Sequence, residues 1–193
     1  MPAEGVPTQF GFATHLFGLQ IFISSDAEGS DICEVGRIGN RPLGLLEPTW
    51  IQLKDGRIVI LTRAELGGFL WRAESRNNGQ TWTDAWQTDI PNPTSLASLV
   101  RLPDGRIALV HNANGGVVGE AAARDPMSVW ISDDELDIWY IKADVIHATP
   151  GPGFSGNLSY PVAQILDGKL TFGYDHNRRQ MRFVEVDVPP PRS

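Results

Sequence analysis

The sequence contains one cysteine, Cys33, so no disulfide can form within the chain, and cysteine usage does not indicate a compartment. No apolar run approaches the roughly 18 residues that a membrane span needs. The first ten residues, MPAEGVPTQF, do not show the basic start and apolar run of a signal peptide. We therefore expect no membrane association, and the localisation stays unknown.

Basic charge is also scarce, since 16 Lys and Arg face 23 Asp and Glu, a net charge of −7. This balance argues against a nucleic acid or an anionic membrane surface as a partner. An anionic ligand would need a local arginine cluster that overcomes the global field. The four histidines show no metal-ligand spacing, so we expect neither a metal nor another cofactor; they are His15, His111, His147 and His176.

Amphipathic stretches of about ten residues are absent, so we expect little or no helix. Glycine (20) and proline (14) are abundant and spread along the chain, which is typical of many short strands joined by tight turns. With 193 residues, 41% of them hydrophobic, the chain is long enough to bury a core. The composition predicts a single all-β domain.

Three segments read alike: EPTWIQLKDGRIVIL (47–61), SLASLVRLPDGRIALV (95–110) and SYPVAQILDGKLTFGY (159–174). In each, an Asp-Gly pair separates two short apolar runs, which is a strong signal for a β-hairpin. The first pair begins at Asp55, the second 49 residues later at Asp104, and the third a further 63 residues later at Asp167. The pattern predicts three hairpins in a repeat.

A second kind of segment alternates with these hairpins: SRNNGQTW (75–82), SDDELDIW (132–139) and, more weakly, SSDAEGSD (24–31). A unit of two hairpins at this period is typical of a four-stranded propeller blade. We therefore predict a partial β-propeller of about three to four four-stranded blades in one domain, 1–188, followed by a disordered tail. The predicted blades are about 10–45, 46–92, 93–150 and 156–188, and the tail is 189–193.

The segment 75–82 resembles the Asp-box S-x-D-x-G-x-T-W, or BNR repeat, of the sialidase (neuraminidase) superfamily. Asn77 stands at the Asp position and can form much the same turn. With the other repeats the resemblance covers roughly 19–187 and corresponds to the C-terminal half of a sialidase-like propeller, in which six blades are expected. Boxes of this kind are mainly structural, so the function has to be sought in other residues.

The box at 132–139 keeps Ser132, Asp134 and Trp139 of the pattern. It departs from the pattern at two positions, with Leu136 in place of Gly and Ile138 in place of Thr.

The resemblance implies a glycoside hydrolase of the exo-α-sialidase type. In that family three arginines bind the sugar carboxylate, a Tyr activated by a Glu is the nucleophile, and an Asp is the acid/base. By order and spacing, the resemblance assigns Glu47 and Tyr160 as catalytic residues and Arg63 and Arg124 as substrate-binding residues. The implied partner is a sialic-acid-like sugar or another glycan.

Each of these four residues also has an ordinary interpretation, as a surface, loop or turn residue. If the family's tyrosine aligns with Leu158, the nucleophile is absent. The first arginine and the acid/base Asp of the family are not found, because Arg37 and Arg41 lie in a linker. Whether the chain is an enzyme therefore stays open.

Three classes of function follow. The chain can belong to a glycosidase, to a carbohydrate-binding propeller without turnover, or to an assembly module. In the third class the open propeller edge recruits a second copy, as a homodimer, or another partner that closes the ring.

Loop asparagines can bond sugar hydroxyls, although solvated loops are the ordinary interpretation; the candidates are Asn92, Asn112 and Asn114. Exposed tryptophans can stack on a sugar face, although packing within a blade is the default; the candidates are Trp50, Trp71 and Trp86.

Overall fold

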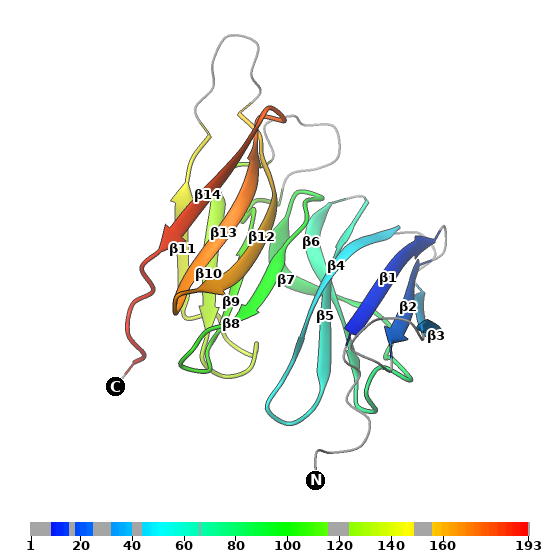
Figure 1. Cartoon of the computed structure of the whole chain (residues 1–193). Coiled ribbons are helices and arrows are strands. Elements are labelled where there is room, and N and C mark those ends of the chain that lie inside the picture. Colours follow the sequence, from blue (N-terminus) through cyan, green and yellow to red (C-terminus); the bar gives the residue numbers. More distant parts are fainter. Residues whose placement is uncertain are drawn as a thin grey trace.

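The computed structural model describes residues 9–15, 18–24, 32–39, 44–65, 67–115, 124–148 and 156–192. Within these residues the regular structure is entirely β, in four antiparallel sheets that follow chain order. The sheets fan out side by side from right to left in Figure 1 and do not close into a ring. The predicted all-β partial propeller is confirmed. In the same ranges no helix is long and apolar enough to span a bilayer.

The strands take up the chain in order. The first sheet holds β1 (Gln9–His15), β2 (Gly18–Ser24) and β3 (Ile32–Gly39). The second holds β4 (Leu45–Gln52), β5 (Ile58–Ala64), β6 (Gly68–Ser75) and β7 (Trp86–Asn92). The third holds β8 (Ser98–Arg101), β9 (Ile107–His111), β10 (Met127–Ser132) and β11 (Ile141–Ile146). The fourth holds β12 (Leu158–Leu166), β13 (Lys169–His176) and β14 (Gln180–Val186).

The three Asp-Gly pairs lie in the turns between β4 and β5, β8 and β9, and β12 and β13. Asp167 and Gly168 both have positive φ, 49° and 79°, as a two-residue hairpin turn requires. The other two turns are longer, and there the Asp carboxylate accepts a hydrogen bond from the backbone N–H two residues on, at 3.0 Å for Asp55 and 3.1 Å for Asp104. The sequence signal therefore marks the same place in each blade through two turn geometries.

The core lies between neighbouring sheets, and β9 shows how it is shared. Alternate side chains of a strand point to opposite faces. Ile107 and Leu109 pack in the cluster between the second and third sheets. Ala108 and Val110 pack with Phe172 in the cluster between the third and fourth sheets. The third sheet is thus covered on both faces, as a blade within a propeller is.

The fourth sheet leaves its outer face uncovered. Four large apolar side chains on β12 and β14 are exposed there: Val162, Leu166, Met181 and Phe183. The ring of Phe183, which is 73% exposed, lies over Gly173, where a Cβ would come within 3.0 Å of it. An apolar face of this kind is what a further blade covers in a propeller.

The segment after β14 contacts the third sheet, although the sequence predicts a disordered tail at 189–193. Arg106 donates a hydrogen bond of 2.7 Å to the carbonyl of Pro189. Arg192 forms a salt bridge of 2.8 Å with Asp133, and its guanidinium lies over the ring of Tyr140 at 4.2 Å. Residues 189–192 therefore have defined partners.

Candidate functional site

Glu47 and Tyr160 occupy matching positions near the starts of β4 and β12. Each precedes a proline and has a positive φ, 49° and 55° respectively, which residues other than glycine seldom adopt. The ladder is irregular at both places, between Leu46 and Thr49 and between Ser159 and Val162. Such bulges re-aim a side chain, and a proline in a bulge leaves no ladder N–H unpaired. Both strand starts lie toward the upper end of the molecule in Figure 1, away from the Asp-Gly turns.

Arg63, near the end of β5, binds Glu47 through two parallel hydrogen bonds. Its Nε donates to Oε2 at 2.7 Å and its Nη2 donates to Oε1 at 3.0 Å. Its Nη1 donates to the hydroxyl of Thr94 at 2.6 Å and to the Thr94 carbonyl at 3.2 Å. All three nitrogens of this guanidinium therefore have partners, and Glu47 balances its charge.

Arg124, just before β10, meets Arg63 at the same carbonyl. Its Nη2 donates to the Thr94 carbonyl at 3.0 Å. Thr94 has a φ of 56°, so its backbone is turned in an unusual way in the loop before β8. The Nη1 of Arg124 is buried without a hydrogen-bond partner among the described residues. A buried cationic donor without an acceptor is costly, so this atom is suited to an anionic ligand.

Tyr160 lies beside two guanidinium groups. The Cζ atoms of Arg124 and Arg178 are 5.4 Å and 5.8 Å from its ring centroid, within the range of cation–π contacts. The Arg178 backbone N–H is bound at 2.6 Å by the carboxylate of Asp175, which fixes the turn after β13. In the described part of the chain, Tyr160 has no hydrogen bond to Glu47, which is bound instead to Arg63.

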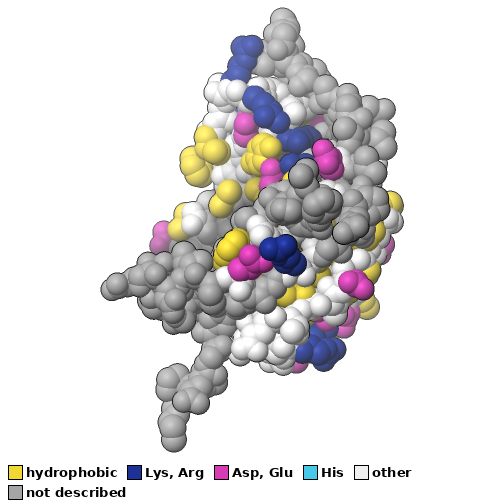
Figure 2. Space-filling model, turned by 90° about the vertical axis from the view of Figure 1, so that its right-hand side faces the viewer, with side chains coloured by type: hydrophobic (Ala, Val, Ile, Leu, Met, Phe, Trp, Pro, Cys, Tyr) yellow, Lys and Arg dark blue, Asp and Glu magenta, His cyan; other side chains and the backbone are white. Residues whose placement is uncertain are grey.

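We call these residues the arginine cluster: Glu47, Arg63, Thr94, Arg124, Tyr160 and Arg178. The side chains of Arg124 and Arg178 have no acidic partner among the described residues. The cluster is therefore locally positive in a chain of net charge −7. Figure 2 shows basic side chains interspersed with acidic ones on the face that it presents. Positive charge is therefore confined to small areas of this face. Planar guanidinium groups suit a carboxylate ligand.

Asn92 and Asn112 do not line a glycan-binding rim, and that expectation is wrong for both. Each is fully buried, with an exposed fraction of 0%. Asn92 exchanges two hydrogen bonds of 2.9 Å with the backbone of Ser95, next to Thr94. Asn112 donates to the carbonyls of three residues at 3.0–3.1 Å, and these are Arg124, Pro126 and Leu158. The two asparagines hold the loops that position the arginine cluster.

Asn114, the third loop candidate, is half-buried and donates to the carbonyl of Asp125 at 3.1 Å. His111 is fully buried at the end of β9, and burial lowers its pKa to about 3, so its ring is neutral at physiological pH. In the described ranges no group of three or more His, Cys, Asp or Glu is gathered as a metal site.

Comparison with known proteins places the chain among propellers with BNR repeats. A family model described as BNR repeat-like domain matches residues 6–172. No curated protein sequence matches the chain. Several solved structures share its fold.

The NanB sialidase of Streptococcus pneumoniae is 17% identical with a TM-score of 0.69, over 93% of this chain and 29% of that one. The leech intramolecular trans-sialidase is 16% identical with a TM-score of 0.66, over 91% and 28%. A protein of unknown function from Dyadobacter fermentans is 18% identical with a TM-score of 0.65, over 91% and 48%. The chain thus spans less than half the length of each of these proteins, and at these identities the likeness concerns the fold.

Proposed function

Because the chain belongs to the family of BNR repeat-like domains, we propose that it is the carboxylate-binding part of a sialidase-like glycoside hydrolase. The observation that carries the proposal is the convergence of Arg63 and Arg124 on the carbonyl of Thr94, beside the ring of Tyr160. Two guanidinium groups held side by side match the two oxygens of a sugar carboxylate. The proposed ligand is a sialic-acid-like sugar.

Arg124 is the principal carboxylate-binding residue in this proposal. Its buried Nη1 has no acceptor among the described residues, so a carboxylate oxygen that displaces the atoms covering it would gain a hydrogen bond without breaking an existing one. Arg63 is held in a fixed orientation by Glu47 and Thr94, so little side-chain entropy remains to be lost when a ligand binds.

Tyr160 and Glu47 are proposed as the nucleophile and its base. The phenol oxygen would attack the anomeric carbon as its proton passes to Glu47, while the glycosidic C–O bond breaks. The leaving oxygen would take a proton from an acid that the resemblance places in blades outside this chain. Water would then hydrolyse the covalent intermediate. One of the two hydrogen bonds between Arg63 and Glu47 must break for this step, because Arg63 occupies both carboxylate oxygens of Glu47.

A carbohydrate-binding propeller without turnover is the second candidate. The same pairing of Glu47 with Arg63 favours it, because Arg63 occupies both carboxylate oxygens that would take the proton of Tyr160. Binding of the acidic sugar without hydrolysis would distinguish this candidate from the first.

The proposal is tested by titrating the chain with N-acetylneuraminic acid and, as a neutral control, N-acetylglucosamine. We expect the acid to bind and Arg124→Lys to weaken that binding at least tenfold, because Lys cannot reproduce the planar fork. Arg182→Lys is the matched control, since Arg182 is exposed on β14 and, among the described residues, its side chain bonds only Gln180. Equal binding of both sugars, or equal binding by wild type and Arg124→Lys, would contradict the proposal. Hydrolysis of a fluorogenic sialoside that Tyr160→Phe abolishes would select the enzyme over the binding module.

An assembly role is favoured by one separate observation, the uncovered apolar face of the fourth sheet. We propose that a second copy of the chain covers this face. Light scattering on a size-exclusion column should give the mass of a dimer, and Phe183→Ser should give the mass of a monomer. A wild-type chain that elutes as a monomer at all concentrations would rule this role out.

A further inference from the structure

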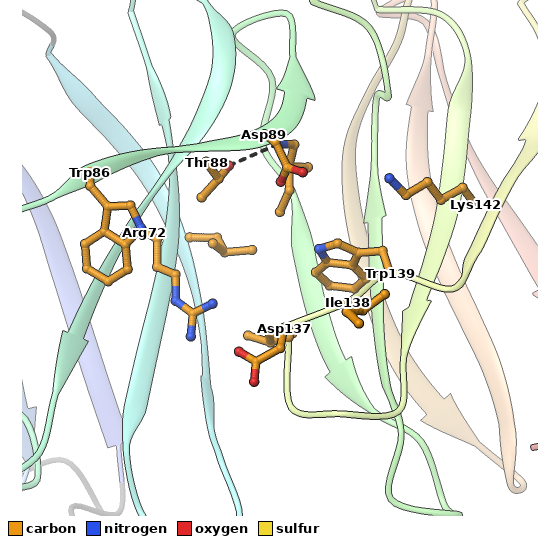
Figure 3. Close-up of a pocket in the computed structure, with 11 residues that line it drawn as sticks. Arg72, Trp86, Thr88, Asp89, Asp137, Ile138, Trp139 and Lys142 are labelled. Atoms are coloured by element: carbon orange, nitrogen blue, oxygen red, sulfur yellow. Dashed lines mark hydrogen bonds between the residues drawn. The ribbon is translucent and has the colours of Figure 1, made fainter.

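A pocket of about 420 Å³ lies on the flank of the molecule, between the second and third sheets. We call it the flank pocket, and Figure 3 shows its lining. Its volume falls within the usual range for small-molecule sites. Buried side chains from both sheets line it, namely Leu61 and Ile90 of the second sheet and Leu136 of the box at 132–139. The pocket shares no residue with the arginine cluster.

Two indoles line the pocket from opposite sides, as Figure 3 shows. Trp86, at the start of β7, is 41% exposed, and the guanidinium of Arg72 lies 5.8 Å from its ring. Trp139, at the end of the box, is mostly buried. A large aromatic side chain that is exposed beside a pocket offers an apolar platform, and the flat face of a pyranose ring fits such a platform.

The departures of this box from the Asp-box pattern contribute to the pocket. In the box at 75–82, the indole N–H of Trp82 donates to the carbonyl of Gly79 at 2.8 Å. Among the hydrogen bonds of the described residues, none corresponds to this one at the indole N–H of Trp139. Leu136 and Ile138, which replace the Gly and Thr of the pattern, both line the pocket. The second box therefore leaves a donor and apolar surface available where the first box is closed on itself.

The charged groups around the pocket favour a neutral ligand. The carboxylates of Asp89 and Asp137 have no hydrogen-bond or ion-pair partner among the described residues. Arg72 is paired with Glu74 at 2.7 Å, although its buried Nε has no hydrogen-bond partner among the described residues. Lys142 lies over the ring of Trp130, 4.1 Å from its centroid. Free carboxylates accept hydrogen bonds from sugar hydroxyls and repel a sugar carboxylate.

We propose that the flank pocket is a second glycan site, which binds one neutral hexose unit. The sugar ring stacks on Trp86, and its hydroxyls donate to Asp89 and Asp137. The indole N–H of Trp139 donates to a ring or hydroxyl oxygen. The site is independent of the proposed carboxylate site, because the two share no side chain. A glycan with an acidic end and a neutral body could then be held at two places, which raises its apparent affinity where its length spans both.

The test is a titration of the chain with the methyl glycosides of glucose, galactose and mannose, followed by tryptophan fluorescence and by amide chemical shifts. We expect at least one of the three to bind and to shift amides of β7 and of the box at 132–139. Trp86→Ala and Asp89→Asn should each weaken this binding at least tenfold. Gln87→Ala, an exposed neighbour on β7, is the matched control and should leave it unchanged.

Arg124→Lys should also leave neutral-sugar binding unchanged, which separates the failure of the arginine cluster from the failure of the flank pocket. The proposal is overturned if none of the three glycosides binds, or if Trp86→Ala binds them as well as wild type. It is also overturned if N-acetylneuraminic acid shifts the same amides more strongly than the neutral sugars, since the carboxylates of the pocket would then not select against an acid.

Discussion

The two box turns, 75–82 and 132–139, share the hydrogen bonds of their serine and Asx side chains although six of their eight residues differ. The hydroxyl of Ser75 accepts from the backbone N–H of Gly79 at 2.8 Å, and the hydroxyl of Ser132 accepts from that of Leu136 at 3.0 Å. The next acceptor is Asn77 in the first box and Asp134 in the second. Their Oδ1 atoms accept the backbone N–H four residues on, at 2.9 Å and 2.8 Å.

The side chains around these bonds serve different purposes. Gly79 has a φ of 81°, and Leu136 takes nearly the same backbone at 77°, where a leucine is strained. Leu136 is nevertheless buried in the core between the second and third sheets. Next to it, Glu135 binds Arg101 at 2.8 Å and the backbone N–H of Lys54 at 2.7 Å, across the two sheets.

The comparison shows that the serine and the Asx-type acceptor make the same hydrogen bonds in both turns, whatever residues stand at the fifth and seventh positions of the box. The other positions are then free to join blades, as Glu135 and Leu136 do, or to line a pocket, as Ile138 does.

The largest effect is expected from Leu136→Gly, which restores the box pattern at the cost of a buried side chain. Loss of the leucine from the core costs about 3 kcal/mol, and relief of the left-handed backbone returns about 1 kcal/mol. We expect a net loss of about 2 kcal/mol in the free energy of unfolding, measured by urea denaturation. Ile138→Thr is the control, because Ile138 is exposed, and it should change stability by less than about 0.5 kcal/mol. A more stable Leu136→Gly variant would mean that strain outweighs packing at this turn.

A smaller effect on stability should distinguish the two turn acceptors, Asn77 and Asp134. Asp134→Ala should destabilise the chain by about 2 kcal/mol and Asn77→Ala by about 1 kcal/mol, because hydrogen bonds to a carboxylate are stronger than those to an amide. The same urea measurement on both variants checks the difference. Equal losses would show that the charge of Asp134 contributes nothing to the turn.

The pH dependence of this pair sharpens the comparison further. Burial raises the pKa of Asp134, but the backbone N–H of Ile138 and the hydroxyl of Ser132 outweigh it, so the pKa lies below its usual value. Its contribution to stability is therefore present above the unfolded-state value of about 4 and is lost as pH falls through the lower folded-state pKa. The difference in the free energy of unfolding between wild type and Asp134→Ala should become smaller below about pH 4. The same difference for Asn77→Ala should not change with pH.

Much of the fold could be predicted because its signals are local. The Asp-Gly turn at 167–168 depends on backbone angles that few residues adopt, and the box turns depend on an Asx-type acceptor, so Gly168 and Asn77 mark their turns in the sequence itself. The contacts of residues 189–192 could not be predicted, because Pro189 and Arg192 meet partners on the third sheet that are far away in the chain.

The site was only partly predictable for the same reason. The resemblance proposed Arg63 and Arg124 as candidates, but the atom at which the two side chains meet is the carbonyl of Thr94, and a backbone atom leaves no trace in the residue type. Arg178 lies in the turn after β13, and only the fold brings it beside Tyr160. Pairing of Glu47 with Arg63 likewise depends on the neighbouring strands β4 and β5, and the residue order of the family does not reveal it.

The most direct test of the central claim is a crystal structure of the chain soaked with N-acetylneuraminic acid. The account predicts that the sugar carboxylate accepts a hydrogen bond from Nη1 of Arg124, the buried donor that has no partner among the described residues. The account would be contradicted by a bound sugar whose carboxylate makes no contact with Arg124, or by a saturating soak that leaves no sugar at the arginine cluster.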